Sequence, residues 1–178
     1  MRLHRYDEVK PTSEQRKAFD CGHESLNRWL ATQARQSMET RDAVTWLLMD
    51  GETIAGYFCL SAGSVIKEAA PAELARRAPN PIPVIRMGRF ALDVAYQGQG
   101  WGGDLLAEAI RSAVSSLDVI GARVMLVDAI NEAAKSFYLK HGFVASPVVP
   151  MQLMVRLQVA QVSQAAAIAA QENDHTSE

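Results

Sequence analysis

The segment Gln97-Gly98-Gln99-Gly100-Trp101-Gly102-Gly103 separates an apolar run typical of a β-strand from a run with helical periodicity. The preceding run, residues 84–94, is long enough to cross a sheet. The following run places apolar side chains on one helical face: Leu105, Leu106, Ala109, Ile110, Ala113 and Val114. This order predicts a strand, a glycine-rich turn and a helix.

The glycine-rich turn has the properties of an anion-binding site. Glycines allow tight backbone turns and leave amide N–H groups uncovered by side chains. The first amides of a helix also have no partner within the helix, and the helix dipole is positive there. A pyrophosphate is therefore the natural ligand. A tight turn that binds nothing is the alternative, since a lone Gly-x-Gly does not distinguish the two.

Two common nucleotide-binding loops do not fit this segment. A P-loop needs Gly-Lys-Ser/Thr, whereas Gly103 is followed by Asp104 and Leu105. A Rossmann loop belongs to an early βαβ unit. Here the glycines come in mid-chain, after an expected hairpin of residues 43–49 and 53–60. The context therefore disfavours both of these nucleotide-binding folds.

The remaining chain alternates between strand and helix patterns, which predicts an α+β (α/β) domain. Strand patterns cover residues 2–6, 123–127 and 151–157, and helical patterns cover residues 24–36 and 131–139. Residues 71–83 hold four prolines and are expected to form a loop around a short helix at 72–78. We expect one domain over residues 1–157 and a tail, 158–178, that is a short helix or disordered.

The composition is that of an ordinary globular protein, with 48% hydrophobic and 21% charged residues among 178. No apolar run is long enough to span a bilayer, and the N-terminus lacks the apolar run of a secretion signal. Cys21 and Cys59 are too few for a disulfide framework or a metal cluster. These features favour a cytoplasmic protein that uses neither membrane nor metal.

The net charge of −2 argues against a whole-molecule electrostatic grip on nucleic acid, but the charges are unevenly distributed. Residues 67–89 hold two acidic residues and five basic ones: Lys67, Arg76, Arg77, Arg86 and Arg89. From Gln158 onward there are three acidic residues and no basic ones, so the net charge without the tail is +1. The basic run is either a solvated surface or a contact with a polyanion.

Two motifs resemble those of the GNAT family of N-acetyltransferases. Residues Gln97 to Gly102 match its acetyl-coenzyme A loop, Q/R-x-x-G-x-G/A. Its second signature, N-x-x-A-x-x-F-Y-x-x-x-G-F, is matched by Asn131, Ala134, Phe137, Tyr138, Gly142 and Phe143. The motifs come in the family's order, and the resemblance spans residues 44–157. It implies the GNAT fold, a central mixed and mostly antiparallel sheet flanked by helices, with acetyl-coenzyme A as cosubstrate.

The resemblance also implies roles for particular residues. Tyr138 matches the family's acid, whose hydroxyl protonates the departing coenzyme A thiolate. A core aromatic pair is the alternative reading of Phe137 and Tyr138. The expected cofactor contacts are Ala91, Leu92, Val94, Gln97, Gly98, Gln99, Gly100, Trp101, Gly102, Asn131 and Phe137.

Other segments resemble, more narrowly, the acetyltransferase toxins of bacterial toxin–antitoxin systems. They are Phe19-Asp20-Cys21-Gly22, Gly88-Arg89-Phe90-Ala91-Leu92-Asp93 and Leu126-Val127-Asp128-Ala129. Such toxins acetylate the α-amine of aminoacyl-tRNA and halt translation. This likeness implies an aminoacyl-tRNA substrate, a ribbon-helix-helix antitoxin through which DNA is bound, and a homodimer. Phosphate contacts to tRNA are then expected from Arg76, Arg77, Arg86 and Arg89, although Arg89 could instead be a structural ion-pair residue.

No histidine or carboxylate lies in a motif position that compels a general-base role; His23, His141, Asp93 and Asp128 can all be structural. An α-amine has a pKa of about 8, and an adjacent ester lowers it, whereas a lysine amine lies at about 10.4. Water is therefore expected to suffice as base for an aminoacyl ester. Acetylation of a protein amine or small-molecule amine, and a non-catalytic coenzyme A-binding module, remain alternatives.

Overall fold

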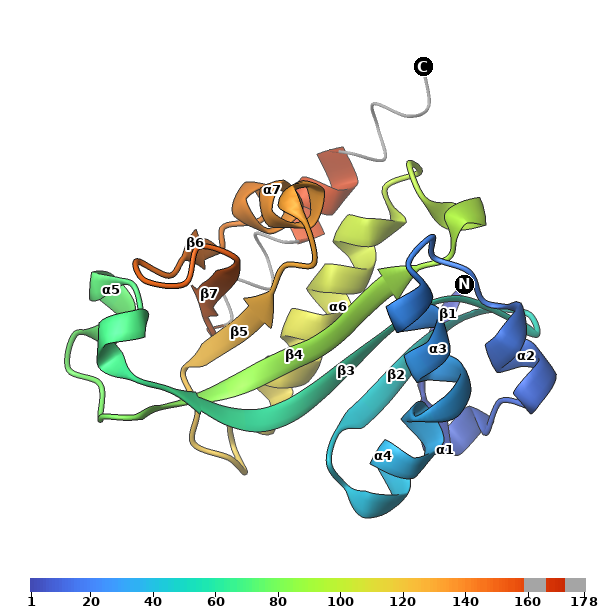
Figure 1. Cartoon of the computed structure of the whole chain (residues 1–178), viewed down its shortest axis with the longest axis horizontal. Coiled ribbons are helices and arrows are strands. Elements are labelled where there is room, and N and C mark those ends of the chain that lie inside the picture. Colours follow the sequence, from blue (N-terminus) through green and yellow to red (C-terminus); the bar gives the residue numbers. More distant parts are fainter. Residues whose placement is uncertain (159–165, 172–178) are drawn as a thin grey trace.

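The computed structural model describes residues 1–158 and 166–171. Its strands form one sheet in the order β1-β2-β3-β4-β5-β7-β6 (Figure 1). They are β1 (Arg2–Arg5), β2 (Val44–Asp50), β3 (Thr53–Val65), β4 (Ile82–Leu92), β5 (Val124–Asp128), β6 (Val144–Ala145) and β7 (Gln152–Arg156). In the described ranges β4 and β5 are the one parallel pair. The predicted mixed, mostly antiparallel sheet is confirmed.

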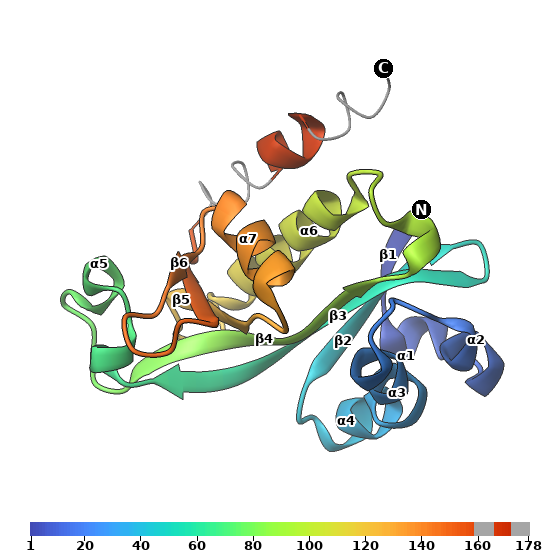
Figure 2. The ribbon, with the colours of Figure 1, turned by 45° about the horizontal axis from the view of Figure 1, so that its top comes forward.

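Helices cover both faces of this sheet (Figure 2). One face carries α1 (Tyr6–Val9), α2 (Ser13–Ala18), α3 (Glu24–Thr32) and α4 (Ala34–Thr40); the other carries α6 (Trp101–Ser116) and α7 (Glu132–Lys140). The connections hold α5 (Ala72–Ala75) and two 3-10 turns, η1 (Lys67–Ala69) and η2 (Val94–Tyr96). The helices and the sheet together have the arrangement expected of a GNAT fold.

Each face of the sheet has its own apolar core. On one side α6 buries Leu105, Leu106 and Ile110 against the central strands. On the other, the Trp29 ring of α3 stacks on Tyr57 of β3, with ring centroids 5.8 Å apart, and the Tyr57 hydroxyl donates to the Leu26 carbonyl at 2.9 Å. Burial of each large side chain contributes about 1.5–3 kcal/mol. Apolar packing therefore holds α3 and α6 on opposite sides of the same strands.

Several element boundaries differ from the sequence expectation. The helix predicted over residues 24–36 is two helices that meet at Gln33. The sequence suggested one helix because the buried apolar face of α3 continues to Ala34 of α4. The strand predicted over residues 84–94 ends at Leu92. There Asp93 caps η2 by accepting from the Ala95 amide at 3.0 Å. In the predicted tail, residues 166–171 form a short helix, and residues 159–165 and 172–178 lie outside the described residues.

Strand β4 is paired on both sides over only its first half. Its parallel pairing with β5 ends at Met87 and Val127, whereas its antiparallel pairing with β3 continues to Leu92. The β3–β4 register shifts at this point, which leaves Gly88 as an extra residue in β4. Such a bulge bends and twists a strand. Beyond Met87, β4 and β5 therefore diverge.

The described part of the chain contains no helix with the length and apolarity that crossing a membrane requires.

We predict that Gly56→Ala destabilises the fold. A Cβ at Gly56 would lie 2.7 Å from Leu92 Cδ2, 3.0 Å from the Ala91 carbonyl oxygen and 3.1 Å from Leu105 Cδ2, so the two leucine side chains and the facing backbone of β4 would have to shift. Overpacking of this kind costs about 1–3 kcal/mol in the free energy of unfolding, measured by urea denaturation. Gly63→Ala, on the same strand, meets no atom closer than 3.4 Å and is the control. Equal stability of the two variants would contradict the prediction.

Candidate active site

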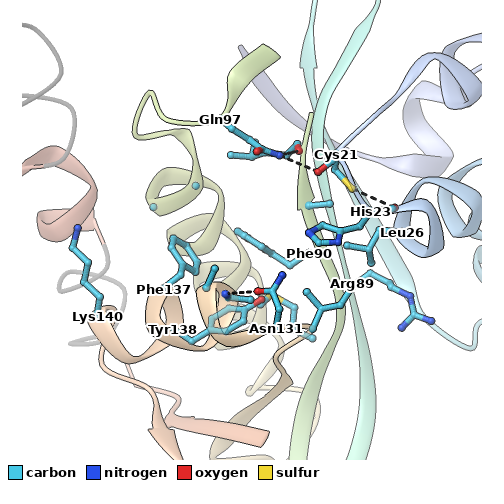
Figure 3. A pocket seen from close by; sticks show the side chains of 18 of the residues that line it. Cys21, His23, Leu26, Arg89, Phe90, Gln97, Asn131, Phe137, Tyr138 and Lys140 are labelled. Atoms are coloured by element: carbon cyan, nitrogen blue, oxygen red, sulfur yellow. Dashed lines mark hydrogen bonds between the residues drawn. The ribbon is translucent and has the colours of Figure 1, made fainter. Parts of the chain in front are cut away.

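A cavity of about 840 Å³ opens where β4 and β5 diverge (Figure 3). Its walls come from six parts of the fold: the start of α3 with the segment before it, the second half of β4, the glycine loop with the start of α6, the end of β5 with the segment after it, helix α7, and the short helix 166–171. Because β4 has no strand partner on its β5 side beyond Met87, peptide groups of β4 face this cavity rather than another strand.

The glycine loop provides a row of unpaired amides. Gly98 and Gly100 have φ values of +72° and +84°, in the left-handed region that favours glycine. Gly100 is also the N-cap of α6. In the described structure, the amides of residues 98–102 have no hydrogen-bond acceptor, whereas Gln97 donates to Val94 at 3.4 Å. Five consecutive amides at the positive end of a sixteen-residue helix are suited to a diphosphate.

Gln97 positions this loop. Its side-chain Nε2 donates to the Leu92 carbonyl at 2.8 Å and to the Cys21 carbonyl at 3.1 Å. The loop is thereby tied both to the end of β4 and to the segment that precedes α3. Gln99 makes a local bond instead, from its Nε2 to the Ala95 carbonyl at 2.8 Å. The Gln97 amide group thus serves as a clamp between elements.

Tyr138 lies on α7 and lines the cavity. The helix starts at Asn131, whose side chain caps it by accepting from the Ala134 amide at 2.8 Å. The Tyr138 ring is 6% exposed and packs against Phe90, Phe137 and Phe143. This burial raises the pKa of the Tyr138 phenol above its ordinary value. The phenol therefore stays protonated at neutral pH and can act as a proton donor.

The carboxylates near the cavity are held by structural contacts. Asp128 lines it, but its carboxylate pairs with Arg86 and accepts from Gln152 Nε2 at 3.0 Å. Asp93 accepts from the amides of Asp20 and Ala95 and lies outside the cavity wall. These contacts suit the structural reading of both carboxylates.

The two histidines considered as candidate bases, His23 and His141, differ in position. His141 is buried, with Nδ1 2.8 Å from the Phe137 carbonyl oxygen. His23 is exposed and lines the cavity beside Leu26 (Figure 3). Sequence reasoning did not place His23 there, because its position depends on how α3 packs on the sheet.

Most of the predicted cofactor residues meet at this cavity: Ala91, Leu92, Gln97, Gly98, Gly100, Gly102, Asn131 and Phe137. The side chains of three others do not line it. Val94 is exposed because β4 has already ended, and Gln99 turns back to Ala95. Trp101 is partly buried in the first turn of α6. Gln99 and Trp101 still contribute amides to the loop.

The four predicted basic residues lie in three different surroundings. Arg89 lines the cavity, and its guanidinium lies 5.5 Å from the Trp29 ring centroid and donates to the Gly88 carbonyl at 2.6 Å, so the contacts found are not those of the alternative ion-pair reading. Arg86 forms the ion pair with Asp128. Arg76 and Arg77 are exposed beside α5, where β4 begins, at the opposite end of β4 from the glycine loop (Figure 1).

Other lining residues carried no sequence signal. Met87, Ile130 and Lys140 are ordinary apolar or charged positions in their local patterns, and they reach the cavity through tertiary packing. Gly88 is the exception, since a glycine within a strand pattern is a signal for a bulge.

We predict that Gln97→Ala lowers the free energy of unfolding by about 1–3 kcal/mol, because it removes two hydrogen bonds between distant segments. Gln99→Ala removes one local bond and is the matched control, with an expected loss of at most about 1 kcal/mol. Chemical denaturation of both variants measures the difference. A Gln97→Ala protein as stable as the parent would show that the clamp is dispensable.

Solved structures of three related complexes resemble this fold. AtaT complexed with acetyl-methionyl-tRNAfMet is 27% identical, with a TM-score of 0.78, over 87% of this chain and 94% of that one. AtaTR bound with AcCoA is 26% identical, with a TM-score of 0.70, over 91% and 95%. A mutant AtaT toxin bound to the C-terminus of the antitoxin AtaR is 26% identical, with a TM-score of 0.71, over 91% and 94%.

Sequence comparison points to the same class of protein. A tRNA-acetylating toxin of Mycobacterium tuberculosis is 33% identical over 141 residues, which cover 79% of this chain and 85% of the relative. The family model described as acetyltransferase (GNAT) domain matches residues 41–145, which include both the glycine loop and Tyr138. With the sheet, the loop and the cavity in place, this match shows that the chain belongs to the GNAT acetyltransferase family.

Proposed function

We propose that this chain is an acetyl-coenzyme A-dependent N-acetyltransferase toxin that acetylates the α-amine of aminoacyl-tRNA and blocks translation. The observation that carries the proposal is a loop of five unpaired amides, three of whose residues line the same cavity as a buried phenol that stays protonated at neutral pH. The tRNA substrate is supported by the relative named as a tRNA-acetylating toxin and by the AtaT complex with acetyl-methionyl-tRNAfMet. We assign the activity to a single domain, residues 1–157.

The cavity walls suit the parts of acetyl-coenzyme A. The amides of residues 98–102 would hold the diphosphate, as their place at the start of α6 favours. The open edge of β4, at Ala91 and Leu92, would offer backbone groups to the pantetheine arm. Phe137 fits against the loop, because a Cβ at Gly102 would lie 3.4 Å from its ring. The AtaTR structure bound with AcCoA supports this choice of cosubstrate.

Tyr138 would serve as the general acid. When an amine attacks the thioester, the departing thiolate needs a proton, and a phenol whose pKa is raised by burial still carries one at neutral pH. The attacking amine must be neutral. The α-amine of an aminoacyl ester has a pKa of about 8 or lower, so water can remove its proton without help from Asp93 or Asp128.

A basic surface beside α5 would position the tRNA. The Arg123 guanidinium donates to the Arg77 carbonyl at 3.5 Å, and that of Arg156 donates to the Glu73 carbonyl at 3.1 Å. These bonds bring the two side chains next to the exposed Arg76 and Arg77, so several positive charges gather at one end of the sheet. Contacts between such positive charges and tRNA phosphates would position the nucleic acid without reading its sequence.

We infer further that a small ribbon-helix-helix antitoxin neutralises the chain, that DNA is bound through that antitoxin, and that the active form is a cytoplasmic homodimer. The structure of an AtaT mutant bound to the C-terminus of the antitoxin AtaR supports the antitoxin. The proposed substrate supports a cytoplasmic location, because charged tRNA is available in the cytoplasm.

Incubation with labelled acetyl-coenzyme A and separate pools of charged tRNA, uncharged tRNA, protein and polyamine tests the substrate. The label should enter charged tRNA and be released, with its amino acid, when the ester is hydrolysed. Label found in protein or polyamine alone would exclude aminoacyl-tRNA and favour the other amine substrates.

We predict that Tyr138→Phe lowers kcat by about 10²-fold or more, because the phenol that supplies the proton is lost while the ring that fills the core stays. Binding of coenzyme A, measured by calorimetry, should be unchanged. Tyr96→Phe removes a hydroxyl that bonds Asp50 away from the cavity, and it is the control. Equal turnover by the Tyr138→Phe variant and the parent would rule out Tyr138 as the acid.

We predict that the double variant Arg76→Glu and Arg77→Glu raises KM for charged tRNA by about tenfold or more, because phosphate contacts are lost. Acetylation of an amino-acid methyl ester should stay at the parent's rate. The control variant, Lys17→Glu with Arg35→Glu, reverses two exposed charges in α2 and α4, which cover the sheet face opposite α6 and α7. If both double variants change KM for tRNA alike, α5 is not the tRNA surface.

A further inference from the structure

The short helix 166–171 belongs to the wall of the cavity. Ile168 and Gln171 line it, although they follow β7 and lie outside both GNAT motifs. Between them Ala169 is completely buried, so the helix packs against the rest of the fold. No step of the proposed chemistry uses this helix.

The cavity has two distinguishable ends (Figure 3). His23, Leu26 and Arg89 lie at one end, and Lys140, whose side chain extends toward the helix 166–171, lies at the other. Phe137 and Tyr138 lie between them. Phe137 also adjoins the glycine loop at Gly102. The glycine loop therefore meets the cavity next to Phe137, and Gln97 ties the start of the loop to the segment before α3.

This order along the cavity places the adenosine part of the cosubstrate next to the helix 166–171. If the thioester is at Tyr138 and the diphosphate at residues 98–102, the adenosine leaves the loop on the side away from Tyr138. That is the side of Lys140 and the helix 166–171, from which Ile168 and Gln171 line the cavity. Ile168 offers an apolar surface for a flat ring, and the Gln171 amide offers a donor and an acceptor. A glutamine amide matches the N6 amino group and N7 of adenine.

We propose that the helix 166–171 is the adenosine-binding wall of the acetyl-coenzyme A site, with Ile168 packed on the adenine and Gln171 bonded to its edge. Lys140 adds positive charge to the same end. The inference rests on the proposed use of acetyl-coenzyme A. It assigns to the C-terminal segment a part in cosubstrate binding that the two GNAT motifs do not cover.

The test compares two acetyl donors in the full-length chain. The variant Ile168→Ala with Gln171→Ala should raise KM for acetyl-coenzyme A by about tenfold, since it loses an amide pair and an apolar contact. Its KM for acetyl-pantetheine, which lacks the adenosine, should stay within about twofold of the parent, as should kcat. Ala167→Ser changes an exposed residue of the same helix and is the control.

The single variant Gln171→Ala keeps the test independent of folding, because Gln171 is exposed and its loss should not change the unfolding midpoint. Adenosine 3′,5′-bisphosphate should inhibit the parent more strongly than this variant. An unchanged KM for acetyl-coenzyme A, a lowered one, or an equal rise for both donors would overturn the inference. If instead the parent binds no coenzyme A at all, the proposed function itself fails.

Discussion

The divergence of β4 from β5 beyond Met87 is the constraint on which the site depends. A fully paired sheet would use the peptide groups of residues 88–92 for its own ladder and leave no room between the strands. The bulge at Gly88 ends that ladder on one side, while β3 continues to pair with β4 on the other. Residues 88–92 of β4 are therefore held in place by pairing with β3, while their edge on the β5 side has no strand partner.

A small set of hydrogen bonds joins the two sides of the cavity into one unit. The Val94 amide donates to the Asp20 carbonyl at 2.8 Å, and the Asp20 amide donates to the Asp93 carboxylate at 2.9 Å. Gln97 adds the bond to the Cys21 carbonyl. The segment that leads into α3 is thus fixed to the turn that leads into α6. Movement of the segment before α3 would therefore disturb the glycine loop.

Local patterns in the sequence predicted the parts of the site that local structure determines. The glycine loop, the apolar face of α6 and the cap at Asn131 depend on neighbouring residues, and the structure places them together with Tyr138. The wall made by α3 and by the helix 166–171 could not be predicted, because periodicity records which face is apolar and not what it packs against. The same limit explains why the predicted tRNA-binding arginines do not lie together. Closeness in sequence suggested one rim, but the length of β4 separates Arg76 and Arg77 from Arg89.

A crystal structure of the chain with acetyl-coenzyme A bound tests the central claim most directly. The account predicts diphosphate oxygens within hydrogen-bonding distance of the amides of residues 98–102, and the Tyr138 hydroxyl next to the thioester sulfur. A cosubstrate that leaves those amides without a ligand, or that places its sulfur away from Tyr138, would contradict it.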